Sequence, residues 1–439
     1  MRLRTASNGM KSIAKFFVVS IMTLLAKAAL VKFKPKIVAI GGSVGKTSTK
    51  DAIFTVLGGG VKARKSEKSY NSDVGVPLAV FGLENAWMNP LVWARNFFLA
   101  LKVLMSDEPF PKVLVLEIGA DRPGDIKKIM RWLKPDISVI TRFGDLPVHV
   151  EFFKDKNELI EEDGMIARAL PKKGLLVANS DDTDSVSMKE KTEARFATYG
   201  FDKNSTIVAS NSQILYDDAG FPTGMTYKIE YEGKSMPVRL FGSLGNVSVY
   251  ASLPALLVGR ELGVNIVQGI EALSNHTPPP GRLRILKGVK NSVVIDDTYN
   301  SSPIAAEEAL RALKELAAPG KKIALLGDML ELGKKSEEAH KAIGERAGVS
   351  CDILVTVGMR ARKIAEGALN AGLSEKNIFQ FEDSRKAGKF TEEIMHEGDA
   401  VLVKGSQSMR MERAVEEIMA EPERKTELLV RQDEEWGRR

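Results

Sequence analysis

The sequence has very few of the residues that build disulfides and metal clusters. It contains one cysteine, Cys351, and four histidines among 439 residues. A single cysteine cannot form a disulfide within the chain, and it excludes a zinc site built from several cysteines. This usage is typical of a protein in a reducing compartment, so we expect a cytoplasmic location.

A strong excess of charge of one sign is also absent. The 63 lysines and arginines nearly balance 57 aspartates and glutamates, which leaves a net charge of +6, and the basic residues are scattered. Nucleic acid is therefore not an expected partner. The chain is 44% hydrophobic, as in ordinary globular proteins, and it is too long for one compact core, so we expect two or three domains.

Long hydrophobic runs are missing too, with one short exception near the N-terminus. Phe16–Ala26 is apolar and is bounded by Lys15 and Lys27, whereas a membrane-spanning helix needs about 20 such residues. No small-residue cleavage site follows, so export is not indicated. We expect residues 1–35 to form an apolar and basic helix. Either its segment 11–34 lies on the inner membrane face, with lysines at anionic headgroups, or it packs on its own protein; a spanning helix ranks behind both.

From residue 36 onward, short β-branched runs alternate with amphipathic stretches. This rhythm is typical of parallel strands covered by helices on both faces, and it predicts an α/β fold. Segment 205–241 has alternating strands between turn signals, which predicts antiparallel hairpins. The prolines of His276–Arg282 favour a stiff connection between domains. We expect a central domain of P-loop ATPase type at 36–277, with a parallel sheet and an antiparallel excursion, a smaller Rossmann-like α/β domain at 278–420, and a charged, solvated or frayed tail at 421–439.

The strongest motif is IVAIGGSVGKTSTK at Ile37–Lys50. It predicts a strand, a glycine-rich turn and the start of a helix. Backbone amides in such a turn face phosphate oxygens, Lys46 neutralises the outer phosphates, and Thr47 offers a hydroxyl to Mg²⁺. Ile40 stands where the general motif has its first glycine, so the turn begins at Gly41 or Gly42. The motif predicts binding of ATP or GTP through Gly42, Ser43, Gly45, Lys46, Thr47 and Ser48.

Two further candidates stand at expected strand ends, on the ligand side of the sheet. Glu117 ends the strand VLVLEIG, and His149 follows SVITRFG. A magnesium nucleotide needs carboxylates close to its phosphates, so Glu117 is a candidate metal ligand, and a cap of the following loop is its alternative. On the residues alone, His149 is open to a structural, a surface or a ligand role.

Taken together, several motifs resemble those of the Mur ligases. They are GGSVGKTSTK, YNSDVGVPL at Tyr70–Leu78, LEIGADRPGDI at Leu116–Ile126, DDTYNSSP at Asp296–Pro303, LLGDMLELG at Leu325–Gly333 and VLVKGS at Val401–Ser406. The chain most resembles the branch that adds D-alanyl-D-alanine to the UDP-N-acetylmuramoyl tripeptide. The resemblance implies an ATP- and magnesium-dependent ligase, in which a substrate carboxylate takes the γ-phosphoryl group and an amine then displaces phosphate from the acyl phosphate.

The resemblance also implies roles for individual residues. Lys46 would act at the phosphates, and Thr47, Glu117 and His149 would hold the metal. Lys156 falls where the family carbamylates a lysine that helps hold a second magnesium ion, and a plain surface lysine is its alternative. The remaining implied roles are a substrate contact for Asn71, charge stabilisation at phosphate or substrate for Lys404, and ATP contacts for Asn246, Arg282, Asp297, Tyr299 and Asn300.

Two features depart from the family pattern. The chain has YNSSP where members commonly have YNANP, and about 36 residues precede the phosphate loop, too few for the separate domain that usually grips UDP. The apolar helix in that place motivates an alternative acceptor that is lipid-linked or otherwise different. A same-fold ligase for another amino acid chain and a noncatalytic nucleotide-binding membrane scaffold also stay open. A monomer is the expected state.

Overall fold

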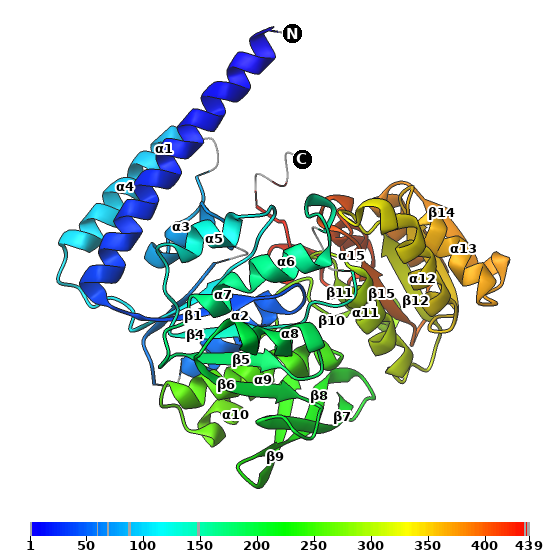
Figure 1. The fold of residues 1–439 in the computed structure, drawn as a ribbon. Coiled ribbons are helices and arrows are strands. Elements are labelled where there is room, and N and C mark those ends of the chain that lie inside the picture. The colour runs from blue at the N-terminus through cyan, green and yellow to red at the C-terminus, as the bar shows by residue number, and fades with distance from the viewer. Residues whose placement is uncertain are drawn as a thin grey trace.

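The computed structural model describes residues 2–58, 60–67, 70–86, 89–146, 150–433 and 436, with side chains from Phe16 onward. Two α/β bodies stand side by side, and a pair of helices projects from the first (Figure 1). The predicted fold class is confirmed, because a mostly parallel sheet with antiparallel hairpins is followed by a second, smaller sheet.

The first sheet has nine strands. They lie in the order β2 (Ala63–Lys65), β3 (Val113–Glu117), β1 (Lys36–Gly41), β4 (Ile137–Ile140), β5 (Leu175–Asn179), β6 (Arg195–Gly200), β7 (Ile207–Tyr216), β8 (Pro222–Tyr231) and β9 (Lys234–Phe241). The strands from β2 to β7 are parallel, whereas β7, β8 and β9 pair antiparallel. The central strands are buried on both faces, which explains their near-continuous apolar sequences.

Helices cover both faces of this sheet. On one face lie α2 (Lys46–Leu57), α9 (Asn246–Glu261) and α10 (Ile266–Ser274). On the other lie α1 (Arg2–Phe33), α3 (Gly75–Phe81), α5 (Asp125–Met130), α6 (Lys156–Asp163) and α7 (Met165–Arg168). Two more helices belong to this body, α4 (Pro90–Met105) beside α1, and α8 (Thr183–Ser187) after β5.

Helix α1 is both packed and exposed. Met22, Ala26 and Ala29 are buried in the core, so the interpretation that it packs on its own protein holds for one face. The rest of the helix is open: the 18-residue window Phe16–Phe33 has a mean hydropathy of 1.9 and is 17% buried. Within the described residues this is the one helix long and apolar enough to cross a membrane, by length and composition only.

The second sheet has six strands. They lie in the order β10 (Arg284–Lys287), β11 (Val293–Asp297), β15 (Ala400–Lys404), β12 (Lys322–Gly327), β13 (Ile353–Val357) and β14 (Ile378–Phe381), and only β10 is antiparallel to its neighbour. Its faces are covered by α11 (Pro303–Glu315), α12 (Ser336–Gly348) and α13 (Arg362–Asn370) on one side, and by α14 (Ser384–Ile394), α15 (Glu412–Ile418) and α16 (Lys425–Leu428) on the other.

The C-terminal segment differs from the solvated or frayed tail expected for 421–439. Leu428 and Leu429 are buried in the second domain's core, and only 4% of the Arg431 side chain is exposed. Arg431 donates to the carbonyl oxygens of Thr298 and Tyr299, at 2.7 Å each. The apolar pair within ELLVRQ is what brings this charged segment back to the protein.

Candidate active site

The phosphate loop joins the end of β1 to the first turn of α2. Gly42 and Gly45 have φ angles of 108° and 89°, a region that favours glycine. The amides of Ser43 and Val44 each donate to the carbonyl oxygen of Arg142 at 3.0 Å, which ties the loop to the end of β4. The first-turn amides of α2 are the ones left to face an anion.

Two oxygen donors meet beside this loop. Thr47 Oγ1 donates a 3.0 Å hydrogen bond to Glu117 Oε2, and both residues are buried. The parallel register sets Glu117 opposite Ile40, so the end of β3 lies next to the loop. A hydroxyl and a carboxylate, completed by phosphate oxygens and water, suit Mg²⁺. The predicted ligand His149 lies outside the described residues, among which no cluster of three or more acidic, His or Cys side chains could hold a metal.

Two cations reach the same place from different domains. Lys46 Nζ donates to the carbonyl oxygen of Gly42 and so folds back over the loop. Arg282 Nη2 donates to Thr47 Oγ1 at 3.3 Å, and its guanidinium lies 4.0 Å from the ring centre of Tyr299. Arg282 Nε is buried without a hydrogen-bond acceptor. Such an orphaned donor costs free energy unless an acceptor reaches it, and a phosphate oxygen would be one.

Lys404 does not present a free charge to the cleft. It ends β15 opposite Asp297 at the end of β11, and its ammonium donates to Asp297 Oδ2 at 2.5 Å and to the carbonyl oxygen of Asn300 at 2.9 Å. Burial lowers the pKa of Lys404, while Asp297 opposes that shift. Lys404 therefore holds the turn that carries Tyr299 and Asn300, and its predicted contact with phosphate or substrate stays a prediction.

Asp296 fixes the other end of the same turn. Its carboxylate is fully buried and accepts from Gly281 N at 3.0 Å, Thr298 N at 3.2 Å and Thr298 Oγ1 at 2.6 Å. Burial raises the pKa of Asp296 to about 6. The neighbouring Asp297 accepts from Leu283 N at 3.2 Å. Both carboxylates thus bind the residues around Arg282 to the end of β11.

Lys156 lies at the first turn of α6. Its ammonium is 2.7 Å from Asp184 Oδ2 and 4.0 Å from Asp145 Oδ1, and 30% of the side chain is exposed. The structure joins Lys156 to Asp184 and not to Thr47 or Glu117, so the carbamate stays a prediction.

The two predicted asparagines are held beside different strands. The carbonyl oxygen of Asn71 accepts from Gly119 N at 3.0 Å, two residues after Glu117. Asn71 therefore lies next to the strand end that carries Glu117, and its contact with substrate stays a prediction. Asn246 begins α9, and its Oδ1 accepts from Ser212 Oγ on β7 at 3.0 Å.

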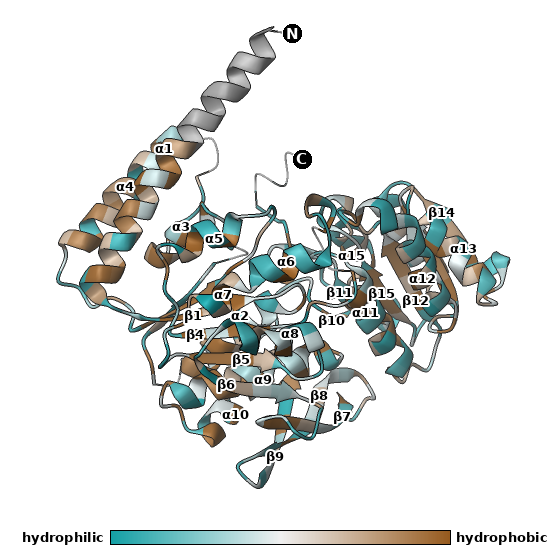
Figure 2. Ribbon diagram, viewed as in Figure 1, coloured by the Kyte–Doolittle hydropathy of each residue, from teal (hydrophilic) through white to brown (hydrophobic). Residues whose placement is uncertain are grey.

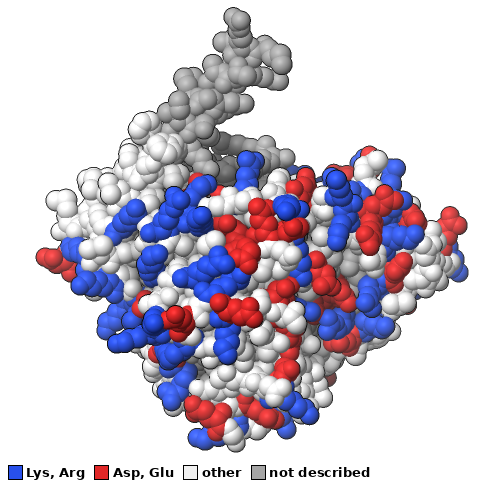
Figure 3. Space-filling view, in the orientation of Figure 1, with Lys and Arg blue, Asp and Glu red and all other residues white. Residues whose placement is uncertain are grey.

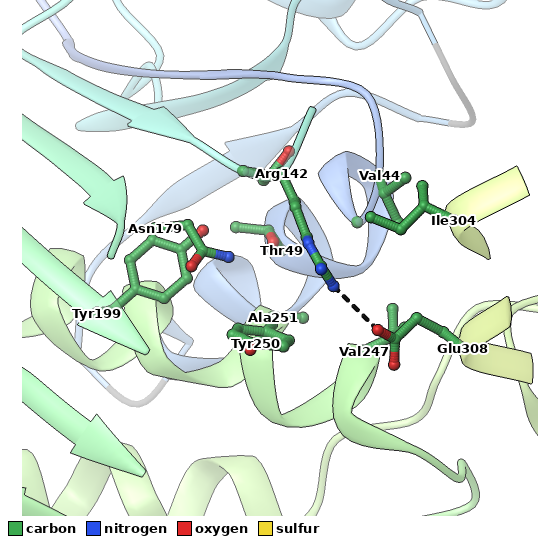
Figure 4. Close-up of a pocket in the computed structure, with 12 residues that line it drawn as sticks. Val44, Thr49, Arg142, Asn179, Tyr199, Val247, Tyr250, Ala251, Ile304 and Glu308 are labelled. Atoms are coloured by element: carbon green, nitrogen blue, oxygen red, sulfur yellow. Dashed lines mark hydrogen bonds and ion pairs between the residues drawn. The ribbon is translucent and has the colours of Figure 1, made fainter. Parts of the chain in front are cut away.

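Sequence reasoning missed a pocket directly behind the phosphate loop (Figure 4). Arg142 crosses it, and Nη1 pairs with Glu308 Oε1 of α11 at 2.9 Å, which links the two domains. Tyr250 donates from its hydroxyl to Asp181 Oδ2 at 2.9 Å, and burial raises the pKa of Tyr250. Asn179 ends β5, a position that the strand-end rule could have found. The lining residues are Val44, Gly45, Thr49, Thr141, Arg142, Asn179, Tyr199, Val247, Tyr250, Ala251, Ile304 and Glu308.

Comparison with protein families identifies both domains. Residues 99–258 match the Mur ligase middle domain, and residues 281–407 match the Mur ligase glutamate ligase domain. The chain is 26% identical over 400 residues to UDP-N-acetylmuramoyl-tripeptide--D-alanyl-D-alanine ligase of Bacillus subtilis (strain 168), covering 91% of this chain and 79% of the relative. It is 25% identical over 384 residues to the enzyme of the same name from Escherichia coli (strain K12), covering 87% and 76%.

Solved structures show the same likeness. The MurF ligase from Thermotoga maritima, in complex with ADP, superposes with a TM-score of 0.75 at 27% identity, covering 93% of this chain and 84% of that one. MurF from Acinetobacter baumannii, at 21% identity and a TM-score of 0.74, shares the fold over 91% of this chain and 79% of its own.

Proposed function

Because this chain belongs to the Mur ligase family, we propose that it joins D-alanyl-D-alanine to the terminal carboxylate of a UDP-N-acetylmuramoyl tripeptide, converting ATP to ADP and phosphate. The observation that carries the proposal is the meeting of Thr47, Glu117 and Arg282 at the phosphate loop. These side chains come from α2, β3 and the second domain, and together they surround the place where a transferred phosphoryl group would lie.

The proposed chemistry places charge where the reaction needs it. The tripeptide carboxylate attacks the γ-phosphorus, the bond to the ADP oxygen breaks, and an acyl phosphate forms. Lys46 and Arg282 stabilise the negative charge on the transferred group. Thr47 and Glu117 would hold Mg²⁺, which supplies further positive charge between the phosphates. The dipeptide amine then attacks the acyl carbon, loses a proton, and phosphate leaves with the former carboxylate oxygen.

The pocket behind the loop supports an assignment for the nucleotide base. It starts at Gly45 of the phosphate loop and is lined by the partly exposed ring of Tyr250, with the buried Tyr199 and Asn179 beneath it. Aromatic rings offer a flat apolar surface, and an amide can both donate to and accept from the edge of a purine. We therefore place the adenine of ATP in this pocket. We also propose that the enzyme is a monomer and works on the cytoplasmic side of the membrane, where ATP is available.

The test is phosphate release by the full-length chain with ATP and Mg²⁺. We expect release that requires both the UDP-N-acetylmuramoyl tripeptide and D-alanyl-D-alanine, compared with each alone and with other amines. Lys46→Ala should reduce the rate at least about 100-fold, because it removes charge from the transferred phosphoryl group. Lys234→Ala, at the exposed start of β9, is the matched control and should keep the wild-type rate.

Two outcomes contradict the proposal. Release that depends on another amine points to a different ligase of the same fold. Slow phosphate release that is the same with and without the two substrates, from a chain that still binds ATP, points to a noncatalytic nucleotide-binding protein.

A further inference from the structure

Helices α1 and α4 form one projecting unit (Figure 1). Their C-terminal ends are tied together, because Lys32 Nζ of α1 donates to the carbonyl oxygens of Leu104 and Ser106 at 2.8 and 3.0 Å. Beside this contact the rings of Phe33 and Phe110 stack with centroids 4.5 Å apart. Because α4 is 16 residues long and begins with an Asn89 cap, the unit is a two-helix surface rather than a single frayed N-terminal helix.

The described parts of α1 and α4 are mostly hydrophobic in sequence (Figure 2), and many of these side chains are exposed. Of the 16 large hydrophobic side chains that are exposed in the described part of the chain, nine lie on these two helices. The most open are Met105 at 84%, Leu91 at 79% and Val31 at 73%. An exposed apolar face of this kind marks an interaction site. The nine residues, together named the α1–α4 face, are Phe16, Phe17, Ile21, Leu24, Val31, Leu91, Phe98, Leu101 and Met105.

Helices α1 and α4 themselves carry basic and no acidic residues, and the nearest acids in sequence after α4 are the exposed Asp107 and Glu108. Residues 1–50 contain no aspartate or glutamate, and neither does 90–105. Exposed cations border the apolar side chains, including Lys27 on α1 and Arg95 and Lys102 on α4. In Figure 3 the described part of the projection is mostly white, while clusters of both signs cover the body of the protein.

We propose that the α1–α4 face docks the ligase onto the surface of an anionic phospholipid bilayer. Apolar side chains enter the boundary between headgroups and acyl chains, and bordering lysines and arginines meet negative headgroups. A second copy of the chain is a poorer occupant, because a symmetric pair would bring together helices whose only charged residues are basic. The inference goes beyond the proposed reaction, and it extends the predicted membrane contact of 11–34 to α4, which the sequence did not indicate.

The test measures binding of the full-length chain to vesicles of phosphatidylglycerol and phosphatidylcholine. We expect binding that rises with the phosphatidylglycerol fraction and weakens with salt. The variant F98E/M105E, which places acids on α4 and leaves α1 intact, should bind at least about tenfold more weakly. V349E/M359E is the matched control, because Val349 and Met359 are also exposed apolar side chains but lie in the second domain, at 55% and 63% exposed.

A second variant tests the proposal without changing any apolar side chain, so that a folding defect of F98E/M105E cannot explain the result. R95E/K102E reverses two exposed charges of α4 and should weaken binding to phosphatidylglycerol vesicles by about tenfold while its thermal unfolding matches the wild type. Phosphate release with soluble substrates is measured in parallel, so loss of docking and loss of ligation are distinguished. Wild-type binding by both α4 variants, equal binding to neutral vesicles, or a dimer without lipid binding would each overturn the proposal.

Discussion

At the scale of single residues, Asp296 makes a pH-dependent contribution to stability. Its burial raises its pKa from 3.8 to about 6, so the native state holds the proton more tightly than the unfolded chain. The resulting stabilisation is fully present below 3.8 and is lost as the pH rises through about 6, a change of about 3 kcal/mol. Because Asp296→Asn cannot ionise, we expect wild type to lose stability relative to this variant between about pH 4 and pH 7.

Urea unfolding of both proteins at the two pH values measures this difference. Asp218→Asn, in the exposed turn between β7 and β8, is the control and should leave the pH dependence of wild type unchanged. Parallel behaviour of wild type and D296N across the range would show that Asp296 is already ionised in the folded protein.

The sequence indicated which residues belong to the candidate site more readily than it indicated which residues they contact. Lys46, Thr47 and Glu117 were identified because a glycine-rich turn and a strand end are local features that meet at one edge of a parallel sheet. Lys404 was identified too, but its partner Asp297 lies 107 positions away and is set opposite it only by the pairing of β11 with β15. Its holding role therefore could not be derived from local sequence.

At the scale of elements, the phosphate loop depends on Gly42 for two separate reasons. Its φ of 108° disfavours a side chain, and a Cβ atom would lie 2.4 Å from Thr141 Oγ1. We expect Gly42→Ala to lower phosphate release at least about tenfold and to destabilise the protein by about 2 kcal/mol.

Gly220→Ala separates the two causes. Gly220 has a φ of 80° but nothing within 4 Å of its would-be Cβ, so this variant tests backbone strain alone. It should lose about 1 kcal/mol of stability and no activity. Equal effects of both substitutions, measured by thermal unfolding and phosphate release, would mean that the contact with Thr141 is unimportant.

Local sequence patterns predicted the helices but not which helices pack together. The alternation of strands and helices after residue 36 predicted the α/β class, because buried parallel strands have near-continuous apolar sequences and the helices that cover them are amphipathic. The pairing of α1 with α4 was missed, since it joins segments more than 70 positions apart through Lys32 and Phe33. A short apolar run indicates a helix, but it does not say which other helix lies beside it.

At the scale of the whole molecule, the site exists only where the two domains meet. Arg282 reaches Thr47 across 235 positions, and Arg142 reaches Glu308 across 166. Arg431 returns from the C-terminal segment to brace Thr298, far from it in sequence. The sequence could predict the two domains separately, but such contacts follow from their packing, and packing has no local signature.

The ion pair between Arg142 and Glu308 joins the two domains inside the pocket that we assign to adenine. It crosses the pocket behind the phosphate loop, with the two side chains 30% and 4% exposed. A partly exposed pair of this kind contributes about 1 kcal/mol, so R142Q and E308Q should each raise the Kd for ATP several-fold. Both variants remove the contact between Arg142 and Glu308, and E308Q also removes the pair of Glu308 with Arg311 on the same helix. Once Glu308 is replaced, the further loss of Arg142 should therefore have no effect, and the double variant should bind ATP as tightly as E308Q. Isothermal titration measures this, with Arg195→Gln, which breaks an exposed pair inside the first domain, as the control. Additive effects would show that the two side chains act separately and that the pair does not couple the domains to nucleotide binding.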